Sequence, residues 1–382
     1  MKPKTKKKSK KHSKIAIVIG TKAELIKCMP IMDELQKQNK DYWFIHTGQH
    51  PLGKACEEFG IKKPDFVLSE EPKISTKYWS KIKLNIFMES VRIMLKIRKL
   101  VKKLKPKYVI YHGDTMSTAM AAGASSNVLN PFNKSWQNVH LEAGLDSGSI
   151  FEPFPEEFTR RIIRGFTNHL FAVSDLSEKN LKKKRSFVGG KSMKVGNTII
   201  DSVEMTYKKA KKRRFKKPRG KYFLINIHRY ENLRSKKRLS QIVNIISHSK
   251  IKGIWPMHSN TKKHLIEYGF MKRVRELKNI EITPPVNYEK FLFLMANCEY
   301  IIADGGSIQE ESLVFKKPYL VMRKFTERQE GIDTGINFLT KLDLEYSKKL
   351  MEKFESGKFK VPKFKNPYGE KGVSKKIIDE LK

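Results

Sequence analysis

Short runs of apolar, often β-branched residues alternate with helix-like segments along most of this 382-residue chain. Runs of this length and composition are typical of strands buried on both faces. The predicted strands are residues 15–19, 43–45, 108–111, 139–141, 170–173, 222–227, 253–255, 300–303 and 318–322. Between them, apolar residues recur at spacings of three and four, which predicts amphipathic helices. The alternation predicts βαβ units and parallel sheets, and therefore an α/β protein.

A strongly basic segment interrupts this alternation. Residues 208–219 contain nine Lys or Arg, and the segment ends in Pro218-Arg-Gly220, a sequence typical of turns. We interpret residues 205–220 as a linker between two doubly wound, Rossmann-like domains, over residues 15–204 and 221–365. Residues 1–14, with eight lysines and no apolar spacing, are predicted to be a disordered basic tail.

Composition limits the classes of function. The chain has 79 Lys and Arg against 39 Asp and Glu, a formal net charge of +40, which favours polyanionic partners such as nucleotides, nucleic acid or anionic membranes. Its 39% hydrophobic content excludes wholesale disorder. The three cysteines have no Cys-x-x-Cys spacing, so neither a disulfide framework nor a thiolate metal site is indicated, and we expect a cytoplasmic protein. No apolar run approaches the length of a membrane-spanning helix.

Polar residues follow seven of the predicted strands. Ligands of open α/β sheets bind outside the carboxyl ends of the strands, so these residues are candidates for one active-site cleft between the two domains. A single such residue is more often a helix cap, but seven together favour a site. They are Gly20-Thr-Lys22, His112-Gly-Asp114, Glu142-Ala-Gly144, His228-Arg229, His258, Asp304-Gly-Gly-Ser307 and Arg323.

The segment Asp304–Ser307 joins a strand to a helix through two glycines. Backbone N–H groups at such a helix start can bind a diphosphate. Neither G-x-G-x-x-G nor a P-loop is present. Glu310 and Glu311, one turn into the helix, are suited to a ribose diol, or equally to complementing the helix dipole. Arg323 and Arg328 are candidate cationic clamps.

The first domain carries four candidate acid–base carboxylates. They are Asp114, Glu142, Glu156 and Glu157, the last two at the predicted start of a helix, where they also complement the dipole. Carboxylates gathered in a cleft separate into acid and base roles, as proton transfer at carbon requires. The spacing of His and Cys residues supports no metal site, and no G-x-S-x-G elbow indicates a serine hydrolase.

In their order and spacing these motifs resemble the non-hydrolysing UDP-N-acetylglucosamine 2-epimerases over roughly residues 14–382. The resemblance implies a GT-B-like pair of Rossmann-type domains, a C-terminal helix within residues 366–382 that returns to the first domain, a homodimer and no cofactor. It is carried by Gly20-Thr-Lys-Ala-Glu24 with Lys27 and Pro30, Thr47-Gly-Gln-His50, His112-Gly-Asp-Thr115, Glu142-Ala-Gly-Leu145, Pro155-Glu-Glu157 with Arg160, Gly196-Asn-Thr198, His228-Arg229, His258, Ser307-Ile-Gln-Glu-Glu311, Val321-Met-Arg323, Thr326-Glu-Arg328 and Asn366-Pro-Tyr-Gly369.

The resemblance also implies a reaction and roles for residues. UDP-N-acetylglucosamine and UDP-N-acetylmannosamine would interconvert by elimination of UDP to a 2-acetamidoglucal and re-addition. Asp114, Glu142 and Glu156 would be the acid–base carboxylates, His228 would assist at the diphosphate or in proton transfer, and Lys22 would neutralise charge at the leaving group. Residues implied to hold UDP or its charge are Lys27, His258, Gly306, Ser307, Glu311, Arg323 and Arg328. In bacterial relatives Gln49 and His50 lie where a second UDP-sugar binds as activator.

Three departures from the family pattern leave the exact sugar open. Lys22-Ala23 stands for the family's Arg-Pro, Asp146 stands for an Arg, and Gln329 stands for a Pro. A Lys is a point charge, whereas an Arg binds phosphate through two parallel donors. A diacetamido-uronic acid or another UDP-2-acetamido sugar, and a hydrolysing 2-epimerase, therefore remain alternatives.

Two further classes compete with the epimerase. A GT-B glycosyltransferase would share the nucleotide site but needs one base for inverting transfer, whereas elimination and re-addition use several carboxylates. A non-enzymatic polyanion binder would show affinity that falls steeply with salt. No interleaved aromatic and basic motif supports nucleic-acid binding, although the basic tail is suited to weak electrostatic binding at anionic surfaces.

Overall fold

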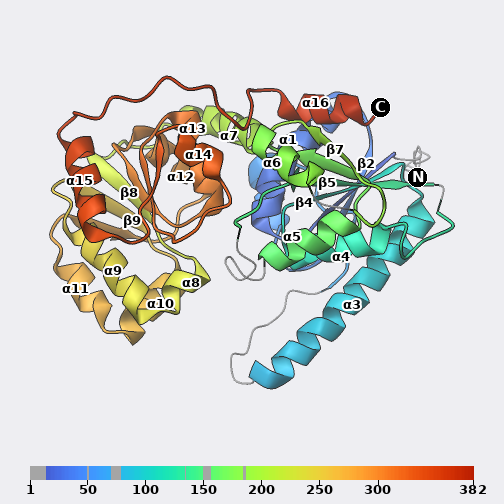
Figure 1. The fold of residues 1–382 in the computed structure, drawn as a ribbon, viewed down its shortest axis with the longest axis horizontal. Helices are drawn as coiled ribbons and strands as arrows, with labels where there is room; N and C mark the ends of the chain where they lie inside the picture. Colours follow the sequence, from blue (N-terminus) through green and yellow to red (C-terminus); the bar gives the residue numbers. More distant parts are fainter. Residues whose placement is uncertain (1–13, 50, 70–78, 134, 149–155, 184–185) are drawn as a thin grey trace, which may run out of the picture. The chain divides into compact units, whose positions relative to one another are not determined.

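The computed structural model describes residues 14–49, 51–69, 79–133, 135–148, 156–183 and 186–382 (Figure 1). The chain divides into two compact units. Unit 1 comprises residues 1–145, 154–198 and 372–382, and unit 2 comprises residues 146–153 and 199–371. Most of unit 2 is therefore one segment, which begins after Thr198 and ends before Gly372. Within the described residues, no helix is both long enough and apolar enough to span a bilayer.

Unit 1 is built on a parallel sheet with strand order β3-β2-β1-β4-β5-β6-β7. Its strands are β1 (Ile15–Ile19), β2 (Tyr42–His46), β3 (Phe66–Val67), β4 (Tyr108–His112), β5 (Gln137–Ala143), β6 (His169–Ala172) and β7 (Lys191–Lys194). Its helices are α1 (Lys22–Lys37), α2 (Gly53–Phe59), α3 (Trp79–Leu104), α4 (Met116–Ser125), α5 (Glu156–Gly165), α6 (Asp175–Lys182) and α16 (Val373–Glu380). The C-terminal helix α16 packs against α1, although the two are separated by most of the chain (Figure 1).

Unit 2 repeats the same winding, with strand order β10-β9-β8-β11-β12-β13. Its strands are β8 (Tyr222–Asn226), β9 (Lys252–Pro256), β10 (Ile280–Thr283), β11 (Ile301–Ala303), β12 (Tyr319–Val321) and β13 (Asn337–Leu339). Its helices are α7 (Ile199–Lys212), α8 (Tyr230–Leu233), α9 (Lys236–Ser247), α10 (Ser259–Glu267), α11 (Phe270–Glu276), α12 (Tyr288–Asn297), α13 (Gly306–Phe315), α14 (Gln329–Asp333) and α15 (Leu344–Glu355).

The central strands read as continuous apolar runs because helices cover both faces of each sheet. Every residue of β1, β4 and β8 is buried. One core cluster of unit 1 joins the β1–β4 strands to α3 and α4, and that of unit 2 joins β8, β9, β11 and β12 to α9 and α15. The predicted fold class, two α/β domains with parallel sheets, is confirmed.

The structure corrects several details of the prediction. Four short strands were not predicted: β3, β7, β10 and β13. Their residues lie at sheet edges and include few fully buried apolar side chains, so they lack the continuous apolar run of a central strand. Strand β5 runs to Ala143, so Glu142 lies inside the strand and not after it. Helix α7 continues to Lys212, so the first part of the predicted linker is helical.

Candidate active site

The backbone at Glu142 is unusual for a strand residue. Its φ is +65°, in the left-handed region, and the pairing of β5 with β6 shifts register between Leu141 and Ala143. A non-glycine residue in this region costs on the order of 1–3 kcal/mol, and bulges of this kind redirect side chains near active sites. Gly144 follows with φ +89°, where an added Cβ would lie 2.3 Å from the Ser177 carbonyl oxygen. The sequence Glu142-Ala-Gly144 therefore forms an irregularity at the end of β5 that sets the direction of the Glu142 carboxylate.

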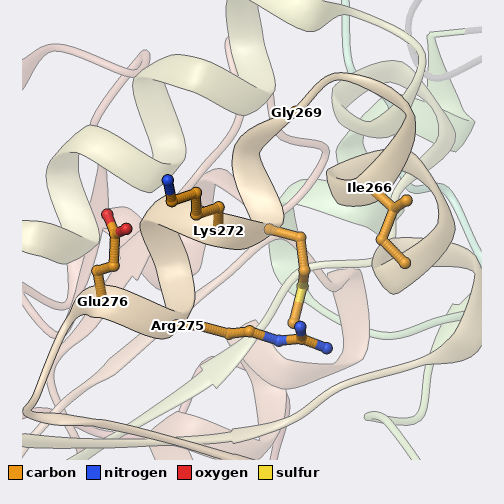
Figure 2. A pocket seen from close by; sticks show the side chains of 6 residues that line it. Ile266, Gly269, Lys272, Arg275 and Glu276 are labelled. Carbon is orange, nitrogen blue, oxygen red and sulfur yellow. The ribbon is translucent and has the colours of Figure 1, made fainter.

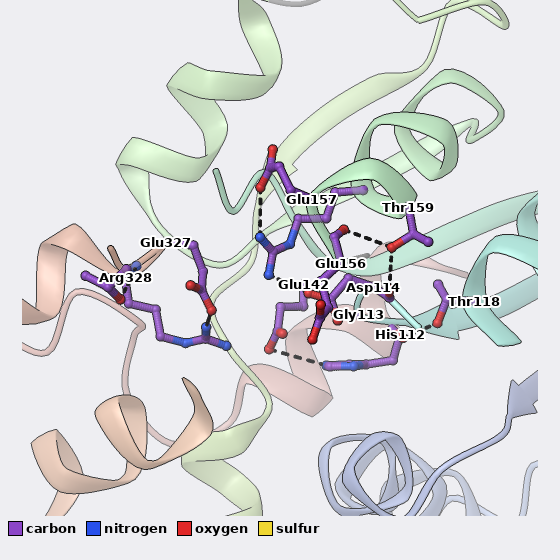
Figure 3. Close-up of polar contacts among 12 residues, drawn as sticks. His112, Gly113, Asp114, Thr118, Glu142, Glu156, Glu157, Thr159, Glu327 and Arg328 are labelled. Carbon is purple, nitrogen blue, oxygen red and sulfur yellow. Dashed lines mark hydrogen bonds and ion pairs between the residues drawn. The ribbon is translucent and has the colours of Figure 1, made fainter. Parts of the chain in front are cut away.

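Three nitrogen atoms lie around Oε2 of Glu142. The Lys27 ammonium forms an ion pair with it, and Asn197 Nδ2 donates a hydrogen bond at 3.2 Å. His112 Nε2 lies 3.7 Å from the same oxygen (Figure 3). The Lys27 and Glu142 side chains are each only 7% exposed. Burial lowers the pKa of His112 to about 4, so the imidazole is neutral at pH 7 and the positive charge beside Glu142 is that of Lys27.

Asp114 and Glu156 are brought together by helix α5. Arg160 donates from Nη2 to Asp114 Oδ2 at 2.5 Å and from Nη1 to Glu157 Oε2 at 2.9 Å. The Thr159 hydroxyl contacts the carbonyl oxygens of both Asp114 and Glu156 (Figure 3). Unit 1 thus gathers the predicted carboxylates and holds Asp114 and Glu142 against one buried cation each. Glu157 serves here as a partner of Arg160.

Lys22 is the exposed cation of the group. It is the first residue of α1, its side chain is 45% exposed, and its ammonium lies 4.0 Å from Glu58. Lys27, one turn further along the same helix, is instead buried against Glu142. The structure therefore separates two lysines to which the family resemblance gave similar roles.

Glu24 is a residue whose part in the site the sequence analysis missed. Its carboxylate accepts backbone hydrogen bonds from Gly20 at 2.6 Å and Thr21 at 2.8 Å, and side-chain bonds from Thr115 and Thr118. Burial raises the pKa of Glu24 above its ordinary value. The capping-box spacing Thr-x-x-Glu was the available signal. Glu24 fastens the loop after β1 to the loop after β4.

Of the two residues predicted for an activator site, Gln49 lies within the described residues and His50 does not. Gln49 accepts a hydrogen bond from Ser117 Oγ at 2.8 Å through Oε1, beside the same loop after β1.

In unit 2, Asp304 organises the segment after β8. Its carboxylate accepts hydrogen bonds at 3.0 Å from the backbone N–H groups of His228 and Arg229 and from Asn232 Nδ2. The His228 ring is held by Asn226 Oδ1 at 2.7 Å, yet its side chain remains 43% exposed. The ring of His258, the N-cap of α10, lies 5.8 Å from that of His228. Burial, and then the neighbouring His228, lower the pKa of His258.

The start of α13 matches the predicted diphosphate site in form. Gly305 is the N-cap and Gly306 the first helical residue, followed by Ser307. A Cβ on Gly306 would lie 2.8 Å from Arg328 Nη1, so the close packing requires glycine. Glu311, one turn on, is buried and accepts a hydrogen bond from Tyr288 Oη at 2.9 Å.

The arginines behind this helix are neutralised within unit 2. Arg328 binds Glu310 at 2.9 Å and also Glu327, and Arg323 binds Glu327 at 3.0 Å. All four side chains are buried. Glu310 is therefore an ion-pair partner of Arg328 in this structure. Arg323 and Arg328, the predicted cationic clamps, are buried and form ion pairs with Glu327 and Glu310.

Of two hollows among the described residues, one is lined by predicted site residues and the other is not. A recess behind Glu142 is lined by His112, Glu142, Asn197 and Ile377, so the C-terminal helix contributes one wall. A larger pocket of about 520 Å³ lies at α10 and α11, with Ile266, Lys272 and Arg275 in its lining (Figure 2). None of the predicted site residues lines this second pocket.

Comparison with known proteins places these features in context. A family model described as UDP-N-acetylglucosamine 2-epimerase matches residues 33–382. The chain is 32% identical to the UDP-N-acetylglucosamine 2-epimerase of Methanocaldococcus jannaschii, over 96% of this chain and 98% of that one. It is 33% identical to a Methanococcus maripaludis protein of the same name, over 96% and 97%.

Solved structures extend the likeness to three dimensions. The M. jannaschii UDP-GlcNAc 2-epimerase in complex with UDP-GlcNAc and UDP aligns with a TM-score of 0.77 and 30% identity, over 96% of this chain and 99% of that one. The Neisseria meningitidis UDP-GlcNAc 2-epimerase bound to UDP-GlcNAc aligns with a TM-score of 0.81 and 27% identity, over the same shares.

Proposed function

Because this chain belongs to the UDP-N-acetylglucosamine 2-epimerase family, we propose that it interconverts UDP-N-acetylglucosamine and UDP-N-acetylmannosamine by inverting C2. The protein is an isomerase. The observation that most directly supports the proposal is the carboxylate cluster of unit 1, in which Glu142 and Asp114 are each fixed by a buried cation, Lys27 and Arg160. A reaction that removes and returns a proton at carbon needs such fixed groups.

The proposed chemistry is an elimination followed by an addition. A carboxylate takes H2 while the C1–O bond breaks, the C2–H electron pair becomes the C1=C2 bond of a 2-acetamidoglucal, and the bond to the leaving UDP ends on the diphosphate. UDP then adds back to C1 as a proton is delivered to the opposite face of C2. Two faces require more than one acid–base group, and we assign these roles to Asp114, Glu142 and Glu156.

The remaining site residues are assigned to charge and binding. His228, half-exposed and held by Asn226, is assigned to the leaving diphosphate or to proton transfer, and the exposed Lys22 to charge neutralisation. Lys27 is assigned to charge neutralisation near the leaving group, and its ammonium forms an ion pair with Glu142. Nucleotide binding is assigned to the start of α13 and its surroundings, namely His258, Gly306, Ser307 and Glu311, with the buried Arg323 and Arg328. The relatives solved with UDP-GlcNAc or UDP support this assignment.

Three further parts of the proposal concern the setting of the enzyme. We assign it to the cytoplasm, as a homodimer, with UDP-sugar activation at Gln49 and His50 as in bacterial relatives. The basic tail of residues 1–14 would add weak electrostatic binding at anionic surfaces. Sedimentation velocity tests the dimer, and the dependence of initial rate on UDP-N-acetylglucosamine concentration, in wild type and Gln49→Ala, tests activation.

Proton NMR in deuterated water tests the reaction itself. Purified protein is incubated with UDP-N-acetylglucosamine, and deuterium at C2 and the products are followed over time. We expect C2 exchange together with UDP-N-acetylmannosamine. Free N-acetylmannosamine would identify a hydrolysing enzyme instead. Absence of exchange with this sugar, but exchange with a UDP-diacetamido-uronic acid, would reassign the substrate, and transfer to an acceptor without exchange would indicate a glycosyltransferase.

A further inference from the structure

The most concentrated charge in the described structure lies on residues 208–221, which we call the basic ribbon. It contains ten Lys or Arg among 14 residues and no Asp or Glu. It begins in the last turn of α7 and ends at the start of β8. Nothing in the reaction uses this charge, and the ribbon contains none of the residues assigned to the site.

The basic ribbon is pinned to the body of unit 2 along its length. Tyr207, just before it, makes an edge contact with Phe315, and Phe215 packs against Phe293 of α12. Arg213 Nε lies 2.6 Å from Glu289 Oε2, also on α12. These contacts use the apolar groups and one cation of the ribbon to hold it against helices. The ribbon is therefore held in place, and most of its other cations are exposed, so that binding costs little further ordering entropy.

Most of the charge on the basic ribbon is uncompensated. Eight of its ten cations are exposed and form no ion pair with a carboxylate of the described residues. Six of the eight follow one another closely between residues 211 and 219; they are Lys211, Lys212, Arg214, Lys216, Lys217 and Arg219. Crowding six like charges together is unfavourable unless a polyanion neutralises them. At physiological salt the screening length is about 8 Å, so neighbouring cations on the ribbon act together on a surface that approaches it.

We propose that the basic ribbon is a peripheral docking surface for anionic phospholipid bilayers. Clusters of four to eight Lys and Arg on a fixed element are typical of binding to acidic headgroups. Seven of the ten cations are Lys, a compact point charge that suits diffuse headgroup charge better than bidentate base recognition. The aromatic rings of the ribbon, Tyr207 at its edge and Phe215, are engaged with Phe315 and Phe293. Single-stranded nucleic acid binding relies on aromatic rings available for stacking, so the membrane is favoured.

Vesicle sedimentation of the full-length protein tests the proposal. The probes are vesicles of phosphatidylcholine alone and of phosphatidylcholine with phosphatidylglycerol, in 0.1 M and 0.5 M NaCl. We expect binding to the anionic vesicles at low salt, release at high salt and little binding to neutral ones. Each cation near such a surface contributes about fivefold to partitioning. Replacing the six exposed cations between residues 211 and 219 by Gln should lower partitioning at least about a hundredfold.

A matched variant separates the ribbon from total charge. It replaces six exposed lysines elsewhere in unit 2 by Gln, namely Lys236, Lys237, Lys262, Lys263, Lys272 and Lys278. We expect this variant to lose less than about threefold in partitioning, because these lysines are dispersed over α9, α10, α11 and the turn before β10. Both variants should retain wild-type thermal unfolding and epimerisation rate, since they leave the site and cores unchanged. The series is repeated with the eight tail lysines changed to Gln, which removes any contribution of the tail.

Several outcomes would overturn the inference. Equal losses for the two six-residue variants would show that only net charge matters. Equal binding to neutral vesicles would remove the electrostatic basis. Ribbon-dependent binding to a labelled 30-nucleotide RNA, in the absence of binding to anionic vesicles, would assign the basic ribbon to nucleic acid instead.

Discussion

The buried pair of Lys27 and Glu142 gives the sharpest quantitative prediction, through the variant Lys27→Met. Both side chains are 7% exposed, and the substitution leaves a carboxylate in that environment without the neighbouring ammonium, while the hydrogen bond from Asn197 is retained. Removing one partner of a buried ion pair typically costs about 3–5 kcal/mol. Protonation of the Glu142 carboxyl would remove the unpaired charge. For an ordinary Glu of pKa about 4.3, protonation at pH 7 costs about 3.7 kcal/mol. We therefore expect a loss of about 3–4 kcal/mol in unfolding free energy, or about 10 °C in melting temperature.

A double-mutant cycle provides the control. In Lys27→Met with Glu142→Gln the buried charge is gone, so most of the lost stability should return, while C2 exchange should stay at least about a hundredfold below wild type. Urea unfolding measures the stability of all four proteins, and NMR in deuterated water measures exchange. The reasoning is refuted if Lys27→Met loses less than about 1 kcal/mol, or if the double variant is as unstable as Lys27→Met.

Three further predictions use other contacts of the site. Arg160→Lys should lower the exchange rate about a hundredfold with little change in KM, because one ammonium cannot hold Asp114 and Glu157 as the forked guanidinium does; wild-type kinetics would contradict this. Burial lowers the pKa of His140 to about 4. Below pH 6.5 this imidazole therefore becomes protonated in the unfolded chain, whereas in the folded chain it stays neutral until about pH 4. Stability should fall between pH 6.5 and about 4, and in His140→Gln the slope of unfolding free energy against pH should be smaller by up to about 1.4 kcal/mol per unit; an unchanged slope would exclude His140. Glu311→Gln should weaken UDP binding about tenfold by calorimetry, with unchanged affinity arguing against a ribose contact.

Local pattern was sufficient for much of this protein. The apolar runs at 15–19, 108–111 and 222–227 correspond to β1, β4 and β8, since a strand covered on both faces must be apolar throughout. Short edge strands such as β3 and β13 lack that requirement and left no comparable signal. The motifs, in their order and spacing, were sufficient for a resemblance to the family that the family model and the relatives then confirmed. Their place after strands was predictable as well, because carboxyl ends of parallel strands share one edge of a sheet.

The partners of the proposed catalytic groups were decided by tertiary structure. Lys27 meets Glu142 across 115 residues, and Arg160 meets Asp114 across 46, and no local spacing encodes either pair. From the sequence, Lys27, Arg323 and Arg328 could be identified as cations, but their ion-pair partners could not be predicted. Packing neutralises each with a buried carboxylate, because an unpaired charge in those positions would be too costly. The sequence by itself determined the strands, helices and chemical groups; the folded chain alone determined which charges remain available, since sheet register and burial set the distances between them.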